Sequence, residues 1–307
     1  MNRKLPSLRM PLLWSVIHFL LLFSLIVPGI NFVTIHVMMG LLLYLYMKLE
    51  VKWFVPLYGA NLLVVLLIAG WKLGVLLLLF PLIFLPGAIV MGILYKRKWS
   101  AFRTVAAGAF TLVAEMLLAL VSVRLTGYDP FQLMKDAMLD SLSVLPQEMV
   151  NKSALDAAFY TIQMVSPILM LGIGFYYALI THGLSRLAFG KKDGTMPALP
   201  PMSRWRVPRI TAVYFIAVMV LSMFVNQTNG SILAMVVLNL LPLLSVLLCI
   251  QALSFLAFLG QKYKWPRAIP WIALALIVIW NAGMYIAVFI GMLDLMFSLK
   301  ERLTDKP

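Results

Sequence analysis

The sequence predicts an all-α, polytopic membrane protein: a transmembrane helix bundle of eight or nine spans with a short external amphipathic helix. Two observations predict this fold class. Of the 307 residues, 63% are hydrophobic and 12% are charged, whereas soluble domains contain about 25% charged residues. In addition, the apolar residues are gathered into long runs with short polar clusters between them, and about 20 apolar residues suffice to cross the hydrocarbon core of a bilayer.

Nine apolar runs are candidate helices. The first three are short, so a tilted or partly re-entrant element among them would leave eight spans instead of nine. The first run is expected to be retained as a span, because no small-residue cleavage pattern follows it. The runs cover residues 11–28, 31–47, 54–70, 73–95, 101–125, 157–187, 210–225, 232–259 and 269–292.

The basic residues predict the orientation of the chain. Of the 25 Lys and Arg residues, 18 fall on one side of the predicted membrane, together with the N-terminus. By the positive-inside rule this side is cytoplasmic. The tail after residue 292 is nearly balanced in charge, which leaves the side of the C-terminus open. Because the basic residues form short clusters between apolar runs, the formal charge of +14 indicates the lipid bilayer as partner and no nucleic acid.

Two connections are longer than hairpins. Residues 126–156, expected on the external side, begin with the helix-start pair Asp129-Pro130 and continue with apolar residues at helical spacing. We expect an amphipathic helix in the headgroup region, with a lid over an external cavity as the alternative. Residues 190–209 form a basic, proline-rich cytoplasmic linker, which is expected to meet anionic headgroups. It separates a first bundle of about six spans, 1–189, from the last three helices and tail, 210–307.

One acidic residue, Glu115, lies deep inside an apolar run. It is 14 residues from the start of the run 101–125, or roughly 21 Å at about 1.5 Å per residue. An ionisable side chain at the centre of a membrane helix costs about 2.5–3.5 kcal/mol and is usually functional. Glu115 is therefore the first candidate for ligand binding, and an interhelical hydrogen bond is the structural alternative.

Other side chains are expected at a similar depth. Membrane helices turn polar groups toward the bundle interior or toward water, so these residues are expected to converge with Glu115 on an outward-facing cavity. The alternative is that each satisfies a neighbouring helix and binds no ligand. His18, by contrast, is expected to be a packing residue. The further ligand-binding candidates are His36, Gln163, Asn239, Asn281 and Trp280.

Small residues at four-residue intervals predict close helix packing. Gly283, Ala287 and Gly291 form one such face, and Ala88 with Gly92 forms another. We expect these residues to be structural, with the last predicted helix inside the bundle or at an interface with a partner.

The sequence contains no motif of an enzyme, a cofactor site or a metal site. The three histidines lie on different segments, and the single cysteine, Cys249, excludes an intramolecular disulfide and a Cys-rich metal site. A glycine-rich phosphate loop and a nucleophile elbow are absent. The chain is therefore not expected to be an enzyme or to bind a cofactor or a metal.

Four segments carry a resemblance to a known family. They are PLIFLPGAIVMGILYKRKWSAFRTVAAG at 81–108, GYDPF at 127–131, RLAFG with PALPPMSRWRVPR within 186–209, and GMLDLMFSLKERL at 291–303. In their order along nearly the whole chain they resemble the YybS family, bacterial membrane proteins with a domain of unknown function. That family is similar to the substrate-binding S components of energy-coupling-factor transporters, which capture vitamins or metal ions outside the cell.

This resemblance implies a multi-pass protein of the bacterial cytoplasmic (inner) membrane with an external small-molecule site. It also implies an energy-coupling ATPase module as a partner. S components often present Ala-x-x-x-Ala on the first helix to the coupling protein, whereas residues 11–28 contain no alanine, which leaves this association open. The second hypothesis is a non-transporting scaffold or regulatory membrane protein that recruits partners through its small-residue faces and basic linker.

Overall fold

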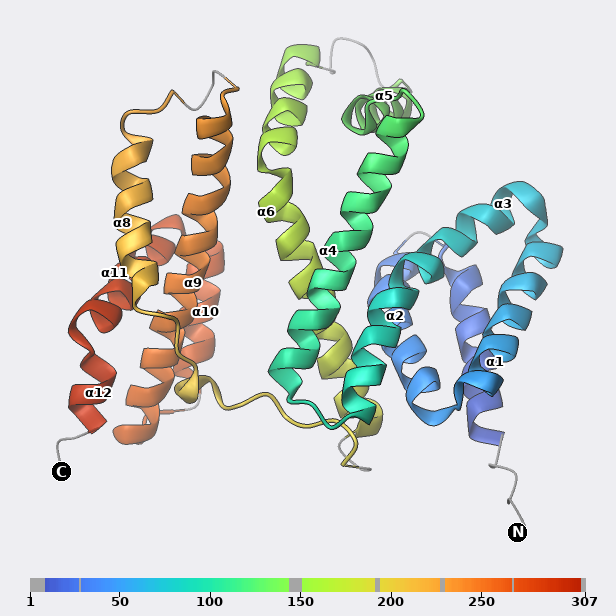
Figure 1. The fold of residues 1–307 in the computed structure, drawn as a ribbon, viewed down its shortest axis with the longest axis horizontal. Helices are drawn as coiled ribbons and strands as arrows, with labels where there is room; N and C mark the ends of the chain where they lie inside the picture. Colours follow the sequence, from blue (N-terminus) through green and yellow to red (C-terminus); the bar gives the residue numbers. More distant parts are fainter. Residues whose placement is uncertain are drawn as a thin grey trace. The chain divides into compact units, whose positions relative to one another are not determined.

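The computed structural model describes residues 9–27, 29–143, 151–190, 194–226, 230–266 and 268–304, and within these ranges it contains helices and no strand (Figure 1). The predicted all-α fold class is confirmed. Residues 144–150 of the predicted external segment and residues 191–193 of the predicted linker lie outside the described residues. The elements are α1 (Arg9–Ser24), α2 (Ile30–Lys48), α3 (Val51–Lys96), α4 (Ala101–Leu125), α5 (Pro130–Leu142), α6 (Lys152–Ser185), η2 (Arg186–Gly190), η3 (Met202–Arg204), α8 (Ile210–Ser222), α9 (Ile232–Lys262), α10 (Ile269–Ile279), α11 (Asn281–Phe297) and α12 (Leu299–Thr304).

Among the described residues, five stretches are long and apolar enough to cross a membrane, and five further apolar helices have 10–17 residues each. This pattern is that of a polytopic helical membrane bundle, as the sequence predicts. The long stretches are Val51–Val75, Leu77–Lys96, Ala101–Leu125, Lys152–Ala188 and Ile232–Lys262.

The helices form two compact units. The first unit comprises Met1–Leu133 and Met170–Leu199, and the second comprises Met134–Leu169 and Pro200–Pro307. The helix α6 therefore contributes its first half to the second unit and its second half to the first. Each unit has a hydrophobic cluster of its own, built around α2, α3 and α4 in the first unit and around α9 and α11 in the second.

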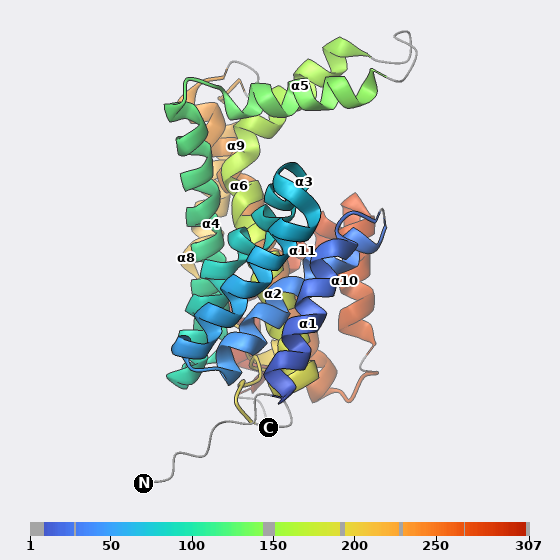
Figure 2. The ribbon, with the colours of Figure 1, turned by 90° about the vertical axis from the view of Figure 1, so that its right-hand side faces the viewer.

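In the first unit, α3 is a hairpin of two helical arms. Its turn is at Gly70, which has φ 73° and ψ 174°, a combination that is essentially restricted to glycine. A Cβ placed on Gly74 would lie 3.0 Å from the Cα of Leu66, so the two arms are in close contact directly after the turn. The runs 54–70 and 73–95 predict these arms. Figure 2 shows α1, α2 and α3 packed side by side.

The helix α4 packs on α3 and on the second half of α6 through small residues. A Cβ on Gly108 would lie 2.6 Å from the Met91 side chain, and a Cβ on Gly174 would lie 2.7 Å from the backbone oxygen of Ala109. The buried side of α4 includes Thr104, Gly108 and Leu112, which recur every three to four residues. The second small-residue pair packs similarly, because Ala88 is 1% exposed and Gly92 faces the Tyr46 ring of α2.

In the second unit, α9 and α11 are packed so closely that their backbones touch. A Cβ on Gly291 would collide with the carbonyl oxygen of Leu248 and would lie 2.8 Å from its carbonyl carbon. Ala287, one turn earlier, is 5% exposed. Beside this contact, the Cys249 thiol lies 3.9 Å from the backbone oxygen of Met284. The face formed by Gly283, Ala287 and Gly291 is thus buried within the unit.

A single helix over 269–292 is a wrong prediction, because the chain breaks at Trp280 into α10 and α11. Trp280 has φ −121° and ψ 114°, which is extended backbone. Gly283 and Leu276 would be about 10 Å apart along an unbroken helix. Instead, a Cβ on Gly283 would lie 2.5 Å from the Leu276 carbonyl oxygen, so α10 and α11 form a hairpin.

The hairpin returns the chain to the end of the second unit that carries the linker. Lys300 donates from its Nζ to the backbone oxygen of Trp205 at 3.2 Å. Lys262, at the end of α9, donates to the backbone oxygen of Leu303. The helix α12, Leu299–Thr304, therefore lies at the same end of the second unit as residues 200–209.

Candidate functional site

Glu115 lies on the buried side of α4 in the first unit, since it follows Gly108 and Leu112 at intervals of seven and three residues. Both of its carboxylate oxygens are shielded from solvent, and neither has a hydrogen-bond partner among the described residues. A buried carboxylate without a partner costs free energy, because it loses hydration and gains no compensating bond. The Glu115 carboxylate thus lowers the stability of the fold, and a role in packing alone does not explain its presence.

His36 and Phe84 occupy the same layer of the first unit as Glu115. A Cβ on Gly87 would lie 2.9 Å from Met39 and 3.3 Å from Leu112, so these three residues mark one depth on α2, α3 and α4. Three residues away from this contact lie His36 on α2, Phe84 on α3 and Glu115 on α4. The second arm of α3 runs parallel to α2, since Gly87 meets Met39 and Gly92 meets Tyr46, and antiparallel to α4. The steps back to His36 and Phe84 and the step forward to Glu115 therefore lead toward the same end of the unit.

This layer also contains two tyrosines of α6. The His36 Nε2 lies 2.7 Å from the Tyr176 hydroxyl, and the ring of Tyr177 lies 5.6 Å from the His36 ring and 5.0 Å from the Phe84 ring. The layer therefore combines a carboxylate, an imidazole and two phenols. Together they offer an anionic acceptor and aromatic faces, a combination that suits a cationic or hydrogen-bond-donating group.

The remaining predicted candidates, Gln163, Asn239, Trp280 and Asn281, belong to the second unit. Asn239 is fully used in a helix contact: its Oδ1 accepts from the Ile168 nitrogen at 2.9 Å, and its Nδ2 donates to the Met164 oxygen at 2.7 Å. It thereby bridges the backbone of α6 beside Pro167, as an interhelical hydrogen bond would. Gln163 is half-buried on α6, and Trp280 and Asn281 are exposed at the turn between α10 and α11.

The other two histidines lie elsewhere in the first unit. His18 is fully buried beside Tyr58, with ring centroids 5.6 Å apart, and neither ring nitrogen has a hydrogen-bond partner among the described residues. The His182 Nδ1 lies 2.5 Å from the Tyr95 hydroxyl. Within the part of the chain that the structure describes, no group of three His, Cys, Asp or Glu side chains could hold a metal ion.

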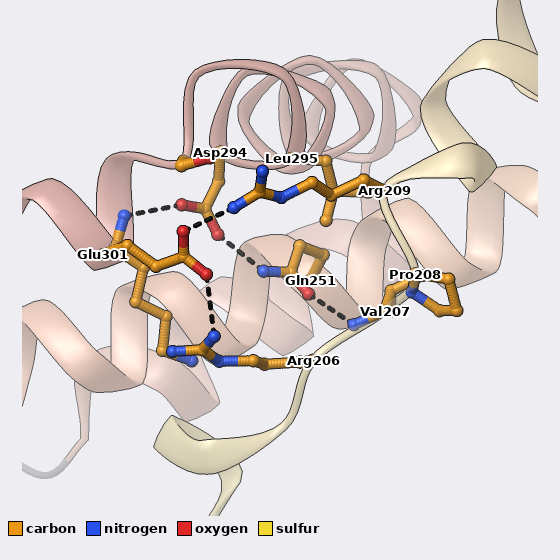
Figure 3. A pocket seen from close by; sticks show the side chains of 10 residues that line it. Arg206, Val207, Pro208, Arg209, Gln251, Asp294, Leu295 and Glu301 are labelled. Carbon is orange, nitrogen blue, oxygen red and sulfur yellow. Dashed lines mark hydrogen bonds and ion pairs between the residues drawn. The ribbon is translucent and has the colours of Figure 1, made fainter.

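A second polar site lies in the second unit, where the linker meets α11 and α12 (Figure 3). It is a cavity of about 220 Å³ that opens to the surface. Arg206 and Arg209 of the linker converge on Glu301 of α12, with 2.8 Å between the Arg206 Nη1 and the Glu301 Oε1. Both guanidinium groups remain more than half exposed, at 61% and 64%.

The floor of this cavity is a chain of buried hydrogen bonds. The Gln251 Oε1 accepts from the Val207 nitrogen at 2.9 Å, and its Nε2 donates to the Asp294 Oδ2 at 2.6 Å. The other carboxylate oxygen of Asp294 accepts from the Lys300 nitrogen at 2.9 Å. Burial lowers the pKa of the Lys300 ammonium below its usual range, while the charge of Asp294 opposes this shift.

Sequence reasoning did not find this second site. Asp294 directly follows an apolar run, much as Glu115 lies within one. An acidic residue in this position is the sequence signal that could have revealed the second site. The predicted run 269–292 ends two residues before Asp294, so its carboxylate was assigned to the tail. Two of the four segments that carry the family resemblance, RWRVPR and GMLDLMFSLKERL, meet at this cavity.

Comparison with known proteins agrees with that resemblance. The family described as "Predicted membrane protein (DUF2232)" matches residues 15–295. The chain is 23% identical to the "Uncharacterized protein YybS" of Bacillus subtilis (strain 168) over 261 residues, which are 76% of this chain and 84% of that protein. No solved structure matches the chain. The resemblance to the YybS family is thereby confirmed.

Proposed function

Because the chain belongs to the DUF2232 family of predicted membrane proteins, we propose that it binds a small molecule between its membrane helices and takes part in its uptake, in the manner of an S component. The site is the layer of the first unit that contains Glu115, His36 and Tyr176. The protein would reside in the bacterial cytoplasmic membrane with its N-terminus inside, and the layer would open outward.

One observation carries this proposal. Both oxygens of Glu115 are shielded from solvent, and the described residues provide them with no hydrogen bond. Ionisable groups inside membrane helices are costly, and they usually mark the path or site of a substrate or ion. A ligand with a positive charge or an N–H donor would supply the missing partner of the carboxylate. Binding would then remove the free-energy cost of the unpartnered carboxylate, which favours the bound state.

The other side chains of this layer narrow the chemistry of the ligand. The aromatic side chains of Phe84, Tyr176 and Tyr177 favour an organic cation, because a cation over an aromatic face is attracted by its quadrupole. His36 and Tyr176 already bond to each other, so they can orient a polar ligand without a large rearrangement. We therefore expect an organic cation with at least one hydrogen-bond donor.

A thermal-shift screen tests the site. The purified protein in detergent is heated with thiamine, choline or spermidine, and a bound compound should raise the unfolding temperature of the wild type. The same compound should give no shift with Glu115→Gln or Glu115→Ala. Asp140→Asn, which neutralises an exposed carboxylate of α5, is the matched control and should retain the shift. A compound that stabilises all four proteins equally would refute the assignment of Glu115.

The partner is tested separately. No ATP-binding motif occurs in the chain, so uphill uptake requires an ATPase partner or an ion gradient. Crosslinking in the membrane followed by purification should recover an energy-coupling ATPase pair. Recovery of envelope or signalling proteins without that pair would favour the scaffold role instead.

A further inference from the structure

The cavity of the second unit has the composition of an anion site. Arg206 and Arg209 each bind Glu301 through one terminal nitrogen, whereas a guanidinium has five N–H donors in a planar fork. Several donors of each arginine therefore remain available at the mouth of the cavity. The two side chains come from one short segment and converge on a single carboxylate, so they would also converge on a single anion (Figure 3).

The charge balance of the cavity leaves an excess of positive charge at these arginines. Three cationic side chains and two carboxylates line it. Asp294 is 3% exposed and already accepts from Gln251 and from the Lys300 backbone. Glu301 alone faces two guanidinium groups. An incoming dianion or monoanion would therefore compete with Glu301 for the arginines.

The surroundings indicate a phosphate group at the membrane surface. A second cavity of about 390 Å³ is lined by residues of the same linker, Met202 and Ser203, and by Trp265, Pro270 and Trp271. The two tryptophans are 39% and 67% exposed, and tryptophan gathers at the level of lipid headgroups. Basic pockets between helices near this level bind anionic headgroups.

From these observations we propose that Arg206 and Arg209 bind the phosphate of an anionic phospholipid headgroup and that Glu301 occupies its place when the site is empty. The shared chemistry is a phosphate ester held by two guanidinium groups. The source that we favour is a lipid, because the same linker that carries the two arginines also lines, through Met202 and Ser203, a mostly apolar cavity with two tryptophans.

The role of Glu301 distinguishes this site from non-specific attraction of lipids to a basic surface. Glu301→Gln removes the competing carboxylate, so it should tighten binding of phosphatidylglycerol. Arg206→Gln with Arg209→Gln should weaken binding at least about tenfold, because each charge-assisted hydrogen bond lost is worth about a factor of ten or more. Arg204→Gln with Arg302→Gln is the matched control, since both arginines are exposed and neither lines the cavity.

Native mass spectrometry of the full chain measures these effects. The protein is released from vesicles of phosphatidylcholine with or without phosphatidylglycerol, and bound lipid is counted for each variant. We expect retention of phosphatidylglycerol by the wild type and the control, loss in the Arg206/Arg209 variant and a gain in Glu301→Gln. Equal loss in the control, or no gain in Glu301→Gln, would overturn the proposal. Displacement of the lipid by glycerol 3-phosphate or inorganic phosphate at equal concentration would overturn the lipid as the source.

Discussion

The contact between Gly291 and Leu248 yields a prediction that tests the packing of the second unit directly. In Gly291→Ala the new Cβ would lie 2.8 Å from the Leu248 carbonyl carbon, whereas nonbonded carbon atoms prefer about 3.5–4.0 Å. The obstacle is backbone, so no change of side-chain rotamer relieves it. The helices α9 and α11 must therefore move apart by about 1 Å.

The expected cost follows from that separation. Overpacking of a close contact costs about 1–3 kcal/mol. The helix propensity of alanine does not offset this cost in a local opening, because α9 and α11 remain helical when they separate. The same separation loosens the bond between Cys249 and the Met284 oxygen, which lies on the same pair of helices. A local opening that becomes easier by 1–3 kcal/mol is populated about 5- to 150-fold more often.

The single cysteine of the chain is a native reporter of this opening, because Cys249 is buried between α9 and α11. The rate of its reaction with a membrane-permeant maleimide in detergent should rise 5- to 150-fold in Gly291→Ala. Gly260→Ala on α9 is the control, since its Cβ would meet only the Trp265 Cβ at 3.9 Å. A labelling rate in Gly291→Ala equal to that of Gly260→Ala would refute the backbone contact between α9 and α11.

Three further predictions concern single residues. Gly70→Ala should destabilise the first unit by about 1–3 kcal/mol in denaturant unfolding, because only glycine adopts the backbone angles of the α3 turn. Asp294→Asn should cost about 1–3 kcal/mol, since the amide cannot accept both from Gln251 and from the Lys300 backbone, whereas Asp140→Asn on the exposed side of α5 should cost little. The backbone hydrogen bond from Gln132 and the charge of Arg124 lower the pKa of Asp129. The start of α5 should therefore be protected above about pH 3.9, the ordinary pKa of an aspartate, and lose protection in hydrogen exchange as the pH falls through the lowered pKa; Asp129→Asn should remove this dependence.

The two helical hairpins show how far the sequence predicts the fold. The α3 turn follows from the sequence, because Gly70 ends one apolar run and a charged residue, Lys72, precedes the next. The turn between α10 and α11 carries no comparable signal. Trp280 and Asn281 interrupt an otherwise apolar run, and the extended conformation of Trp280 accompanies the close packing of Gly283 against Leu276. Periodicity cannot reveal such a tertiary contact.

The polar residues show the same limit on what can be predicted from the sequence. Glu115 could be found from the sequence, because a carboxylate in an apolar run is conspicuous by its cost alone. Asn239 and Gln251 could not be distinguished in advance, since each is one amide in an apolar helix. The structure separates them only by their partners: Asn239 bridges the backbone of α6, and Gln251 joins the linker to Asp294. Partners depend on which helices become neighbours, which the sequence does not state.

The two acidic residues of the apolar helices should respond in opposite ways to the same substitution. Asp294 has a donor on each oxygen, so Asp294→Asn removes an interaction that the fold uses. Glu115 has no donor on either oxygen among the described residues, so Glu115→Gln removes no hydrogen bond. It should not lower the free energy of unfolding, because an amide costs less to desolvate than a carboxylate. A loss of stability in Glu115→Gln as large as in Asp294→Asn would show that Glu115 already has a structural partner. In that case the carboxylate would not need a ligand as its hydrogen-bond partner, and the proposed site would be wrong.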